Sequence, residues 1–236
     1  SVTEGNANVS RRAADEIDQY VHNALTILES TAETMSQADL QGRQQERILK
    51  NYINRFDEFN EISLWDADGR PVATSRLEPR EIQEGERRVF QQALKGETAL
   101  SPVFIKEDLT PAMTAAVPVR RLAEVSGVLV AELDLLQMWY LVDGIRIAKK
   151  GILHVLDAQG RLIASGDGER KKDVFQQKTF EPRGEIEAIF GPGGTVFRNP
   201  AGVKVLAVGA RLKAPLSWSV IVEQPTSEAY ALATRI

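Results

Sequence analysis

The spacing of hydrophobic positions changes along the chain, and these changes predict the order of its helices. Between residues 9 and 35 apolar residues recur at intervals of three or four, with no proline or glycine: Ala14, Ile17, Val21, Ala24, Leu28, Ala32 and Met35. This spacing predicts one long amphipathic helix. Further helical patterns cover residues 39–56, 84–94 and 134–142, and a last helix begins at Thr226.

Short β-prone runs bounded by turn residues predict two groups of strands. The first group begins at Ile62 and continues over 72–74, 100–105, 112–118 and 126–133. The second group covers 152–156, 162–164, 195–198, 203–210 and 218–223. Hairpin-like turns join neighbouring runs, so each group is expected to form an antiparallel sheet with flanking helices, an α+β fold.

A repeated segment indicates that the two groups are copies of one unit. Residues 64–75, LWDADGRPVATS, return as residues 155–166, VLDAQGRLIASG, so that Asp66 corresponds to Asp157, 91 residues later. Two more segments match in the same order at a shift of 92: residues 115–119 with 207–211, and 127–132 with 219–224. A period of this length fits a whole small module, and we interpret the chain as two tandem copies.

The shared Asp-Ala-x-Gly stretch predicts a tight turn in which glycine adopts a positive φ. Asp66-x-Asp68-Gly69 also allows a calcium loop to be considered. The remaining ligand positions and the terminal Glu of such a loop are absent, which favours the turn.

Composition excludes several classes of function. The chain has 236 residues, 43% hydrophobic and 26% charged, with a net charge of −4 and no basic cluster, so nucleic acid is not expected as a partner. Cysteine is absent, which excludes disulfides, thiolate metal sites and cysteine nucleophiles. No apolar run reaches the ~18–20 residues of a membrane span. Both ends of the sequence look like cuts through a longer chain.

The residues that commonly carry catalysis are scattered. His22 and His154 lie far apart, and neither is near a second imidazole or a nucleophile. Gly191 to Gly194 lack the Lys-Ser/Thr of a phosphate loop, and no carboxylate pair stands out for acid–base work. We therefore expect no enzymatic activity, no metal and no cofactor in this chain.

The order of these segments resembles the double Cache sensor domains of bacterial and archaeal transmembrane receptors. The resemblance covers the whole chain and rests on the long first helix, both Asp-Ala-x-Gly-Arg turns, residues 115–119, 127–135 and 151–160, and WSVIVEQP at 218–225 running into a helix. It implies two PAS-like modules outside the membrane. The expected division is 1–56 for the first two helices, 57–142 for a membrane-distal module with a linker helix, 143–225 for a membrane-proximal module, and 226–236 for a helix leading to the membrane.

The resemblance also implies a ligand site in the distal module. Amino-acid-binding members carry Arg-x-Trp-Tyr on a helix, an aromatic-x-Asp on the next strand and an Asp before the linker. The matching residues here are Arg87, Val89, Phe90, Phe104, Lys106 and Glu132, and Met113 is added as an apolar neighbour. The Arg that would bind a ligand carboxylate is kept, but the Trp is Val89, the first acid is Lys106 and the second is Glu132. This favours a small organic acid or another anion over an α-amino acid. A solvated helix face for Arg87 and core packing for Phe90 and Phe104 remain alternative interpretations.

The expected function is therefore extracytoplasmic ligand sensing in a membrane-tethered, periplasmic part of a receptor. A sensor histidine kinase of a two-component system is the favoured receptor, with a chemoreceptor or a diguanylate cyclase as alternatives. The rival from another class is an orphan dimeric scaffold whose first pocket is filled by Val89, Phe104 and Met113. The heptad-like spacing of the first helix allows either packing on its own modules or a homodimer seam.

Overall fold

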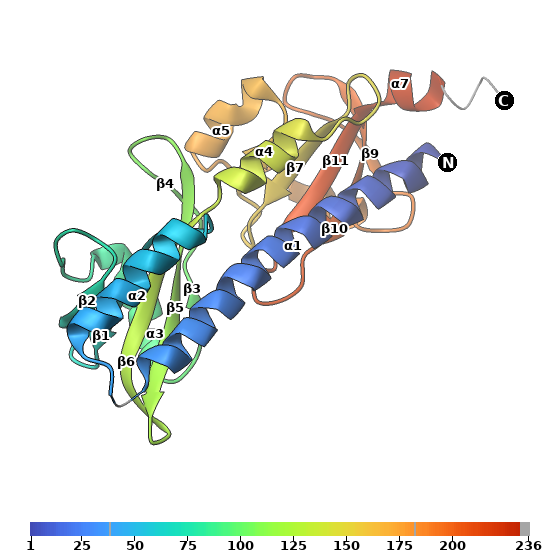
Figure 1. The fold of residues 1–236 in the computed structure, drawn as a ribbon. Coiled ribbons are helices and arrows are strands. Elements are labelled where there is room, and N and C mark those ends of the chain that lie inside the picture. Colours follow the sequence, from blue (N-terminus) through green and yellow to red (C-terminus); the bar gives the residue numbers. More distant parts are fainter. Residues whose placement is uncertain (38, 182, 232–236) are drawn as a thin grey trace. The chain divides into compact units, whose positions relative to one another are not determined.

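The computed structural model describes residues 1–37, 39–181 and 183–231, apart from the side chain of residue 185 (Figure 1). The chain forms two compact units. Tyr20–Leu135 make up the first module, and Ser1–Gln19 together with the residues from Leu136 onward make up the second module. The first helix, α1 (Val2–Met35), contributes to both modules.

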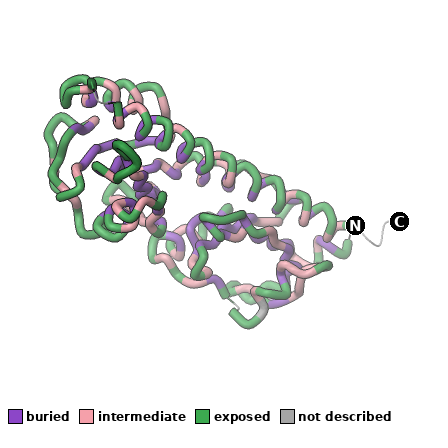
Figure 2. Tube along the Cα trace, turned by 90° about the horizontal axis from the view of Figure 1, so that it is seen from below, coloured by how far each residue is buried: buried purple, intermediate pink, exposed green. Residues whose placement is uncertain are grey.

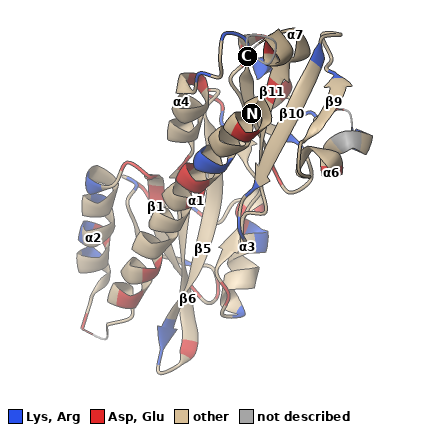
Figure 3. Ribbon diagram, turned by 90° about the vertical axis from the view of Figure 1, so that its right-hand side faces the viewer, with Lys and Arg blue, Asp and Glu red and all other residues tan. Residues whose placement is uncertain are grey.

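The first module contains a mixed set of helices and an antiparallel sheet. Its strands β1 (Phe59–Asp66), β2 (Pro71–Thr74), β6 (Glu124–Asp134), β5 (Pro111–Arg121) and β3 (Ala99–Leu100) lie in the order β2-β1-β6-β5-β3, and β4 (Phe104–Ile105) also pairs with β5. Helix α3 (Glu84–Leu94) lies on one side of this sheet, and α2 (Gly42–Arg55) with the second part of α1 lies on the other (Figures 1 and 3).

The second module repeats this strand order. Its sheet runs β8 (Leu162–Ser165), β7 (Ile152–Leu156), β11 (Ser219–Pro225), β10 (Lys204–Arg211) and β9 (Thr195–Arg198), all antiparallel. Its helical segments are α4 (Leu136–Gly144), η1 (Gly168–Arg170), α5 (Lys171–Phe175), η2 (Arg183–Glu185), α6 (Ile186–Ile189) and α7 (Thr226–Ala231). The matching order confirms the tandem α+β fold expected from the repeated segments.

The two repeated turns have the same hydrogen bonds. Oδ1 of Asp66 accepts from the backbone N–H groups of Asp68 and Arg70, both at 2.9 Å, and Oδ1 of Asp157 accepts from those of Gln159 and Arg161 at the same distance. Gly69 and Gly160 adopt φ angles of +80° and +78°. Each aspartate therefore stabilises the turn between two neighbouring strands. The positive φ at the last residue of this turn favours glycine.

The core of the first module lies on both faces of its sheet because side chains alternate along each strand. On the face toward α3, Trp65, Ala116, Val128 and Val130 pack against Val89, Phe90 and Ala93 of the helix. The opposite face is also apolar: Ile62, Leu64, Met113, Leu129 and Leu133 are each at most 5% exposed.

The core of the second module follows the same principle. Leu156, Val205, Ala207 and Ile221 face Val174 and Ile189 of α5 and α6, with Phe180 among them. On the other face, Leu206 and Val208 pack against Ala229 of α7 and against Val2 and Ala7 of α1.

The apolar stripe of α1 is buried within the chain itself. Ile17, Val21 and Leu28 are at most 2% exposed. Figure 2 shows the helix alternating between a buried and an exposed side, and Figure 3 shows acidic and basic residues interspersed along it. The residues whose spacing suggested a seam for a second chain are therefore used for packing inside one chain.

Most expected elements are found, and the differences occur where the local signal is weak. Helix α3 begins and ends at the predicted residues, whereas α1 begins at Val2, earlier than the spacing indicated. The predicted strand 100–105 is divided into β3 and β4, with Pro102 between them, because proline cannot donate to a ladder. The short helices η1 and α5, over residues 168–175, are not among the expected helices.

Candidate functional site

The sheet of the first module has a polar end on the face covered by α3. Alternation places Glu61 and Ser63 of β1, Thr114 of β5 and Glu132 of β6 on the same face as Trp65 and Val130. Glu132 is the cross-strand partner of both Glu61 and Thr114. Ser63, Thr74 and Thr114 are at most 4% exposed. This row of buried polar groups on a sheet otherwise lined by apolar residues is the candidate ligand site.

Cations compensate the two facing carboxylates. Like charges directly opposite each other on neighbouring strands repel, so each carboxylate needs a partner. Glu61 accepts from Nε of Arg80 at 3.0 Å and from Nη1 of Arg76 at 3.3 Å. Glu132 contacts Nζ of Lys106 at 3.0 Å and accepts from the side-chain amide of Asn60 at 2.8 Å.

Arg80 connects this site to the start of α3. Its guanidinium donates two hydrogen bonds to the carboxylate of Glu86, at 2.6 and 2.8 Å, and lies 5.5 Å from the ring centroid of Trp65. Glu86 also accepts from the backbone N–H of Gln83 and so caps the helix. The hydrogen bonds that Arg80 donates to Glu86 raise the pKa of Arg80 further above its ordinary value, so that this residue is a permanent cation.

Lys106 forms a partly exposed ion pair with Glu132. Burial alone would lower the pKa of Lys106, but the hydrogen bond and the charge of Glu132 outweigh it and raise the pKa above its ordinary value. Its side chain is 30% exposed and that of Glu132 is 22% exposed. Lys106 is therefore a cation at neutral pH, and both side chains of the pair are partly exposed.

The structure brings together only part of the residues expected from sequence. Lys106 and Glu132 form an ion pair, and Phe104 is half-buried on β4, two positions before Lys106. Arg87 is exposed on α3 and makes no hydrogen bond or ion pair with any described residue.

The other expected residues pack in the core. Val89 and Phe90 are 2% and 7% exposed in the apolar cluster under α3. Met113 is buried on the sheet face opposite to Glu132, so these two side chains do not line one site together.

Sequence reasoning missed Glu61, Ser63, Arg76, Arg80 and Thr114. One signal was present: Glu61 and Ser63 alternate with the buried Ile62 and Leu64 in a strand whose two faces are both covered. Polar residues at such positions require partners, and a buried polar row is a reason to search the neighbouring strands for them. Arg76 and Arg80 lie in the loop after β2, whose path no periodicity predicts.

The second module holds a buried polar cluster of its own. His154 on β7 is fully buried, accepts or donates at 2.9 Å through Nδ1 with the hydroxyl of Ser165, and places Nε2 3.3 Å from a carboxylate oxygen of Glu223 on β11. Nη1 of Arg170 lies 3.7 Å from the other oxygen of Glu223. Burial alone would raise the pKa of Glu223, but His154 first, and then Arg170 and Asn199, lower it below its ordinary value.

The described residues show neither a transmembrane helix nor a metal site. None of their helices combines the length and the hydrophobicity needed to cross a bilayer. Likewise, in ranges 1–37, 39–181 and 183–231 no three His, Asp or Glu side chains gather in a way that could hold a metal ion.

Two sheets of the same strand order, each covered by helices on one face and by parts of α1 and further helices on the other, define a tandem PAS-like sensor fold. The sequence model of the Cache domain, dCache_1, matches residues 1–233. The chain belongs to the Cache domain family, whose double-module members are the extracellular sensor domains of membrane receptors. The family resemblance read from sequence is thus confirmed. No curated protein matched the sequence.

Solved structures with this fold are distant in sequence. The ligand-binding domain of the amino acid chemoreceptor PctC of Pseudomonas aeruginosa PAO1, in complex with GABA, has a TM-score of 0.77 at 14% identity, covering 94% of this chain and 99% of that chain. The ligand-binding domain of Mlp24 with asparagine has a TM-score of 0.73 at 16% identity, covering 99% and 95%. The extracellular domain of the putative histidine kinase mmHK1S-Z2 has a TM-score of 0.77 at 15% identity, covering 97% and 98%.

Proposed function

We propose that this chain is the extracytoplasmic ligand-sensing domain of a transmembrane signalling receptor and that it binds a small organic acid at the polar end of the first sheet. The observation that carries the proposal is the row formed by Glu61, Glu132 and Thr114, in which Thr114 is buried and the two carboxylates are partly buried, on a sheet face that is otherwise apolar. Buried polar groups are costly unless they serve partners, and concave apolar sites with a few polar groups are typical of ligand binding.

Every cation of the site is already paired with a carboxylate of the chain, and this determines which ion pair a ligand can replace. The cations Arg76, Arg80 and Lys106 are matched by the carboxylates Glu61, Glu86 and Glu132. An incoming carboxylate must therefore displace an internal one. The Lys106–Glu132 pair is more exposed than the Arg80–Glu86 pair and lacks its bidentate geometry, so a ligand carboxylate would reach Lys106 rather than Arg80.

An amino acid is the second candidate ligand, favoured by Glu132 itself. When a ligand carboxylate pairs with Lys106, Glu132 loses its cation while it still faces Glu61. A ligand ammonium group would then supply Glu132 with a new cation. Two of the structural relatives are in complex with GABA and with asparagine, which carry both groups.

The two ligand classes are distinguished by matched pairs of compounds that differ only in an amino group. Butyrate against GABA, and succinate against aspartate, are titrated by calorimetry and by ligand-dependent thermal stabilisation. Lys106→Met is expected to weaken either class, while Lys95→Met, an exposed lysine of the same module, serves as the control. Glu132→Gln separates them: it strengthens binding of a simple acid by releasing Lys106 and weakens binding of an amino acid.

The exposed guanidinium of Arg87 is tested in the same assay. Arg87→Ala is expected to reduce ligand-induced stabilisation, as the family pattern implies, and unchanged stabilisation would remove Arg87 from the site. If none of the acids or amino acids binds saturably, the scaffold interpretation, in which the first module is filled by its own side chains, replaces the sensor proposal.

The remaining parts of the proposal concern the whole receptor. We propose a histidine kinase output, with a chemoreceptor or a diguanylate cyclase as alternatives, and signalling by a shift between two conformations that is limited by the ligand's differential affinity for them. Homodimerisation through α1 belongs to the same proposal. Because the apolar stripe of α1 is buried within the chain, such a dimer would use the polar outer side, which sedimentation velocity at increasing salt concentration tests.

A further inference from the structure

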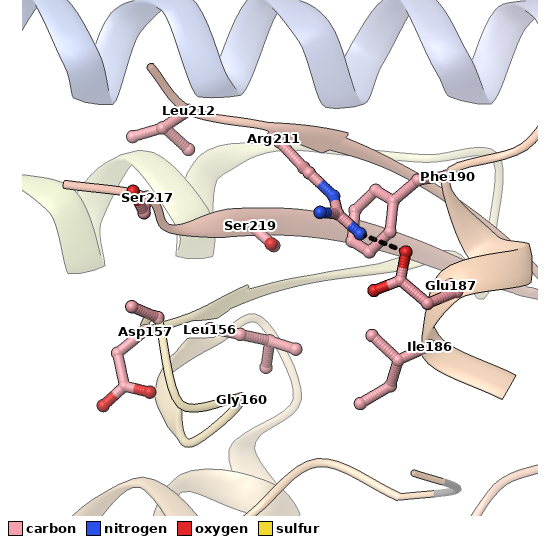
Figure 4. A pocket seen from close by; sticks show the side chains of 11 residues that line it. Leu156, Asp157, Gly160, Ile186, Glu187, Phe190, Arg211, Leu212, Ser217 and Ser219 are labelled. Carbon is pink, nitrogen blue, oxygen red and sulfur yellow. Dashed lines mark hydrogen bonds and ion pairs between the residues drawn. The ribbon is translucent and has the colours of Figure 1, made fainter. Parts of the chain in front are cut away.

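A cavity of about 260 Å³ lies on the second module, at the end of its sheet farthest from Glu223 (Figure 4). Arg211 of β10 and Ser219 of β11 supply polar groups from the sheet, and Glu187 and Phe190 come from α6 and the residue that follows it. Leu156 and Ile186 add apolar surface. The volume is at the small end of ligand pockets and fits a compact molecule.

The sheet is shaped to receive the ring of Phe190. A Cβ atom added at Gly209 of β10 would lie 2.6 Å from this ring, so glycine is required for the ring to rest on the strand. The guanidinium carbon of Arg211 in turn lies 4.5 Å from the ring centroid. Stacking on an aromatic ring fixes the plane of a guanidinium and leaves its N–H groups directed outward.

The counterion of Arg211 is weakly held. Nη2 of Arg211 donates to Glu187 at 2.7 Å, but the two side chains are 53% and 84% exposed. An ion pair this exposed contributes little, because water competes for both groups. Glu187 also belongs to a helix of only four residues, Ile186–Ile189. An incoming anion can therefore replace Glu187 on Arg211 at small cost.

The other polar groups of the cavity suit an anion as well. Asp157 does not compete, because its two carboxylate oxygens accept from the turn N–H groups of Gln159 and Arg161 and from Nε of Arg161, at 2.7 to 2.9 Å. Figure 4 shows its carboxylate directed away from Arg211. The hydroxyl groups of Ser217 and Ser219 have no hydrogen-bond partner in the described part of the chain and can donate to a ligand.

We propose that this cavity is a second ligand site, which binds a small monocarboxylate with a short apolar tail. The ligand carboxylate accepts hydrogen bonds from the guanidinium of Arg211 and from the hydroxyl of Ser219. The apolar tail contacts Leu156, Ile186 and Phe190. A cation is disfavoured because, of the two acids among the described residues that line the cavity, Asp157 is held by its own turn and Glu187 is 84% exposed, whereas the guanidinium of Arg211 lies against the ring of Phe190. This site is separate from the site in the first module and does not depend on it.

The test uses hexanoate as the probe, with hexan-1-ol and hexylamine as neutral and cationic controls of the same length. Binding to the whole chain is followed by NMR titration of the backbone amides around Phe190 and Ser219. Hexanoate should shift these amides saturably, and the alcohol and the amine should not. Arg211→Gln should weaken hexanoate binding roughly tenfold, as expected for a charge-assisted hydrogen bond. Arg198→Gln, an exposed arginine of the neighbouring strand β9, is the matched control.

Glu187→Gln should strengthen binding, a result that is not expected if Arg211 has a purely structural role. Removal of the competing carboxylate should strengthen hexanoate binding about two- to fivefold, the range of an exposed ion pair. This variant changes a highly exposed residue and is expected to fold even if Arg211→Gln does not. Lys106→Met in the first module should leave the shifts at Phe190 and Ser219 unchanged, so failure of one site is distinguishable from failure of the other.

Equal shifts with hexanoate and hexan-1-ol would overturn the proposal, because binding would then not depend on the carboxylate. Unchanged or weaker binding in Glu187→Gln would also overturn it, since Arg211 would then not be the group that receives the anion.

Discussion

Glu61 and Glu132 face each other across β1 and β6. Cations from loops near both edges of the sheet pair with these two carboxylates. Arg76 and Arg80 follow β2, and Lys106 follows β4. The charged end of the first sheet therefore depends on loop residues far from it in sequence, and its stability should respond to each of them.

Arg80→Met is expected to destabilise the first module. The substitution leaves Glu86 and Glu61, with side chains 11% and 13% exposed, without their main cation. Removal of one partner from a buried pair costs about 3–5 kcal/mol, and the partial exposure of Arg80 reduces the expected loss to about 2–3 kcal/mol. Urea denaturation measures it. Arg70→Met, which removes an exposed pair with Asp68, should change the free energy of unfolding by less than ~0.5 kcal/mol.

Glu223 should make the second module sensitive to acid. Its pKa in the folded chain lies below its ordinary value, so its carboxylate stabilises the fold at pH above the unfolded value of about 4.3, and this contribution is lost as the pH falls through the lower, folded value. Glu223→Gln should therefore reduce the loss of stability between about pH 5 and pH 2, while lowering stability at pH 7. Glu169→Gln, at an exposed position of the same module, is the control, and equal acid profiles in both variants would contradict the expectation.

The two repeated turns should be equally intolerant of alanine. Gly69 and Gly160 both have φ near +80°, where a side chain costs about 1–2 kcal/mol. Gly69→Ala and Gly160→Ala are each expected to lower the free energy of unfolding by about that amount. Gly85→Ala, in helix α3 with no atom within 4 Å of the added carbon, should be neutral or slightly stabilising. Unequal losses at the two turns would show that the copies no longer share this constraint.

Asn6 should be needed to satisfy a buried amide. Its side chain donates to Oε1 of Gln224 at 2.9 Å, and the two residues are 6% and 1% exposed. Asn6→Ala leaves the Gln224 acceptor buried without this donor, which costs about 1–3 kcal/mol. Thermal unfolding compares it with Asn8→Ala, two residues along α1, where the side chain is exposed and little loss is expected.

The repeated pattern predicted the fold because the same Asp-stabilised turn and flanking strands occur in both modules. An aspartate, a glycine and flanking β-branched residues determine each hairpin, and helical spacing located α3 to the residue. The site was predicted less fully. Lys106 and Glu132 were proposed from the family pattern and lie together as an ion pair, whereas Arg80 and Glu61 meet only through a loop path that single-sequence patterns do not determine.

Met113 illustrates a further limit of sequence reasoning. Its apolar character fitted a pocket, but which face of β5 it occupies depends on the pairing register with β6. A displacement of one residue would exchange the two faces of the strand, so such an assignment requires the sheet itself.

Strand β11 ends at Pro225 and helix α7 begins at Thr226, with no residue between them. Because no loop residue separates the strand from the helix, few backbone dihedrals can absorb a displacement between them. Ala229 of α7 is moreover clamped against Leu206 and Val208 of the neighbouring strand. A small tilt of β11 would therefore be expected to change the direction of α7.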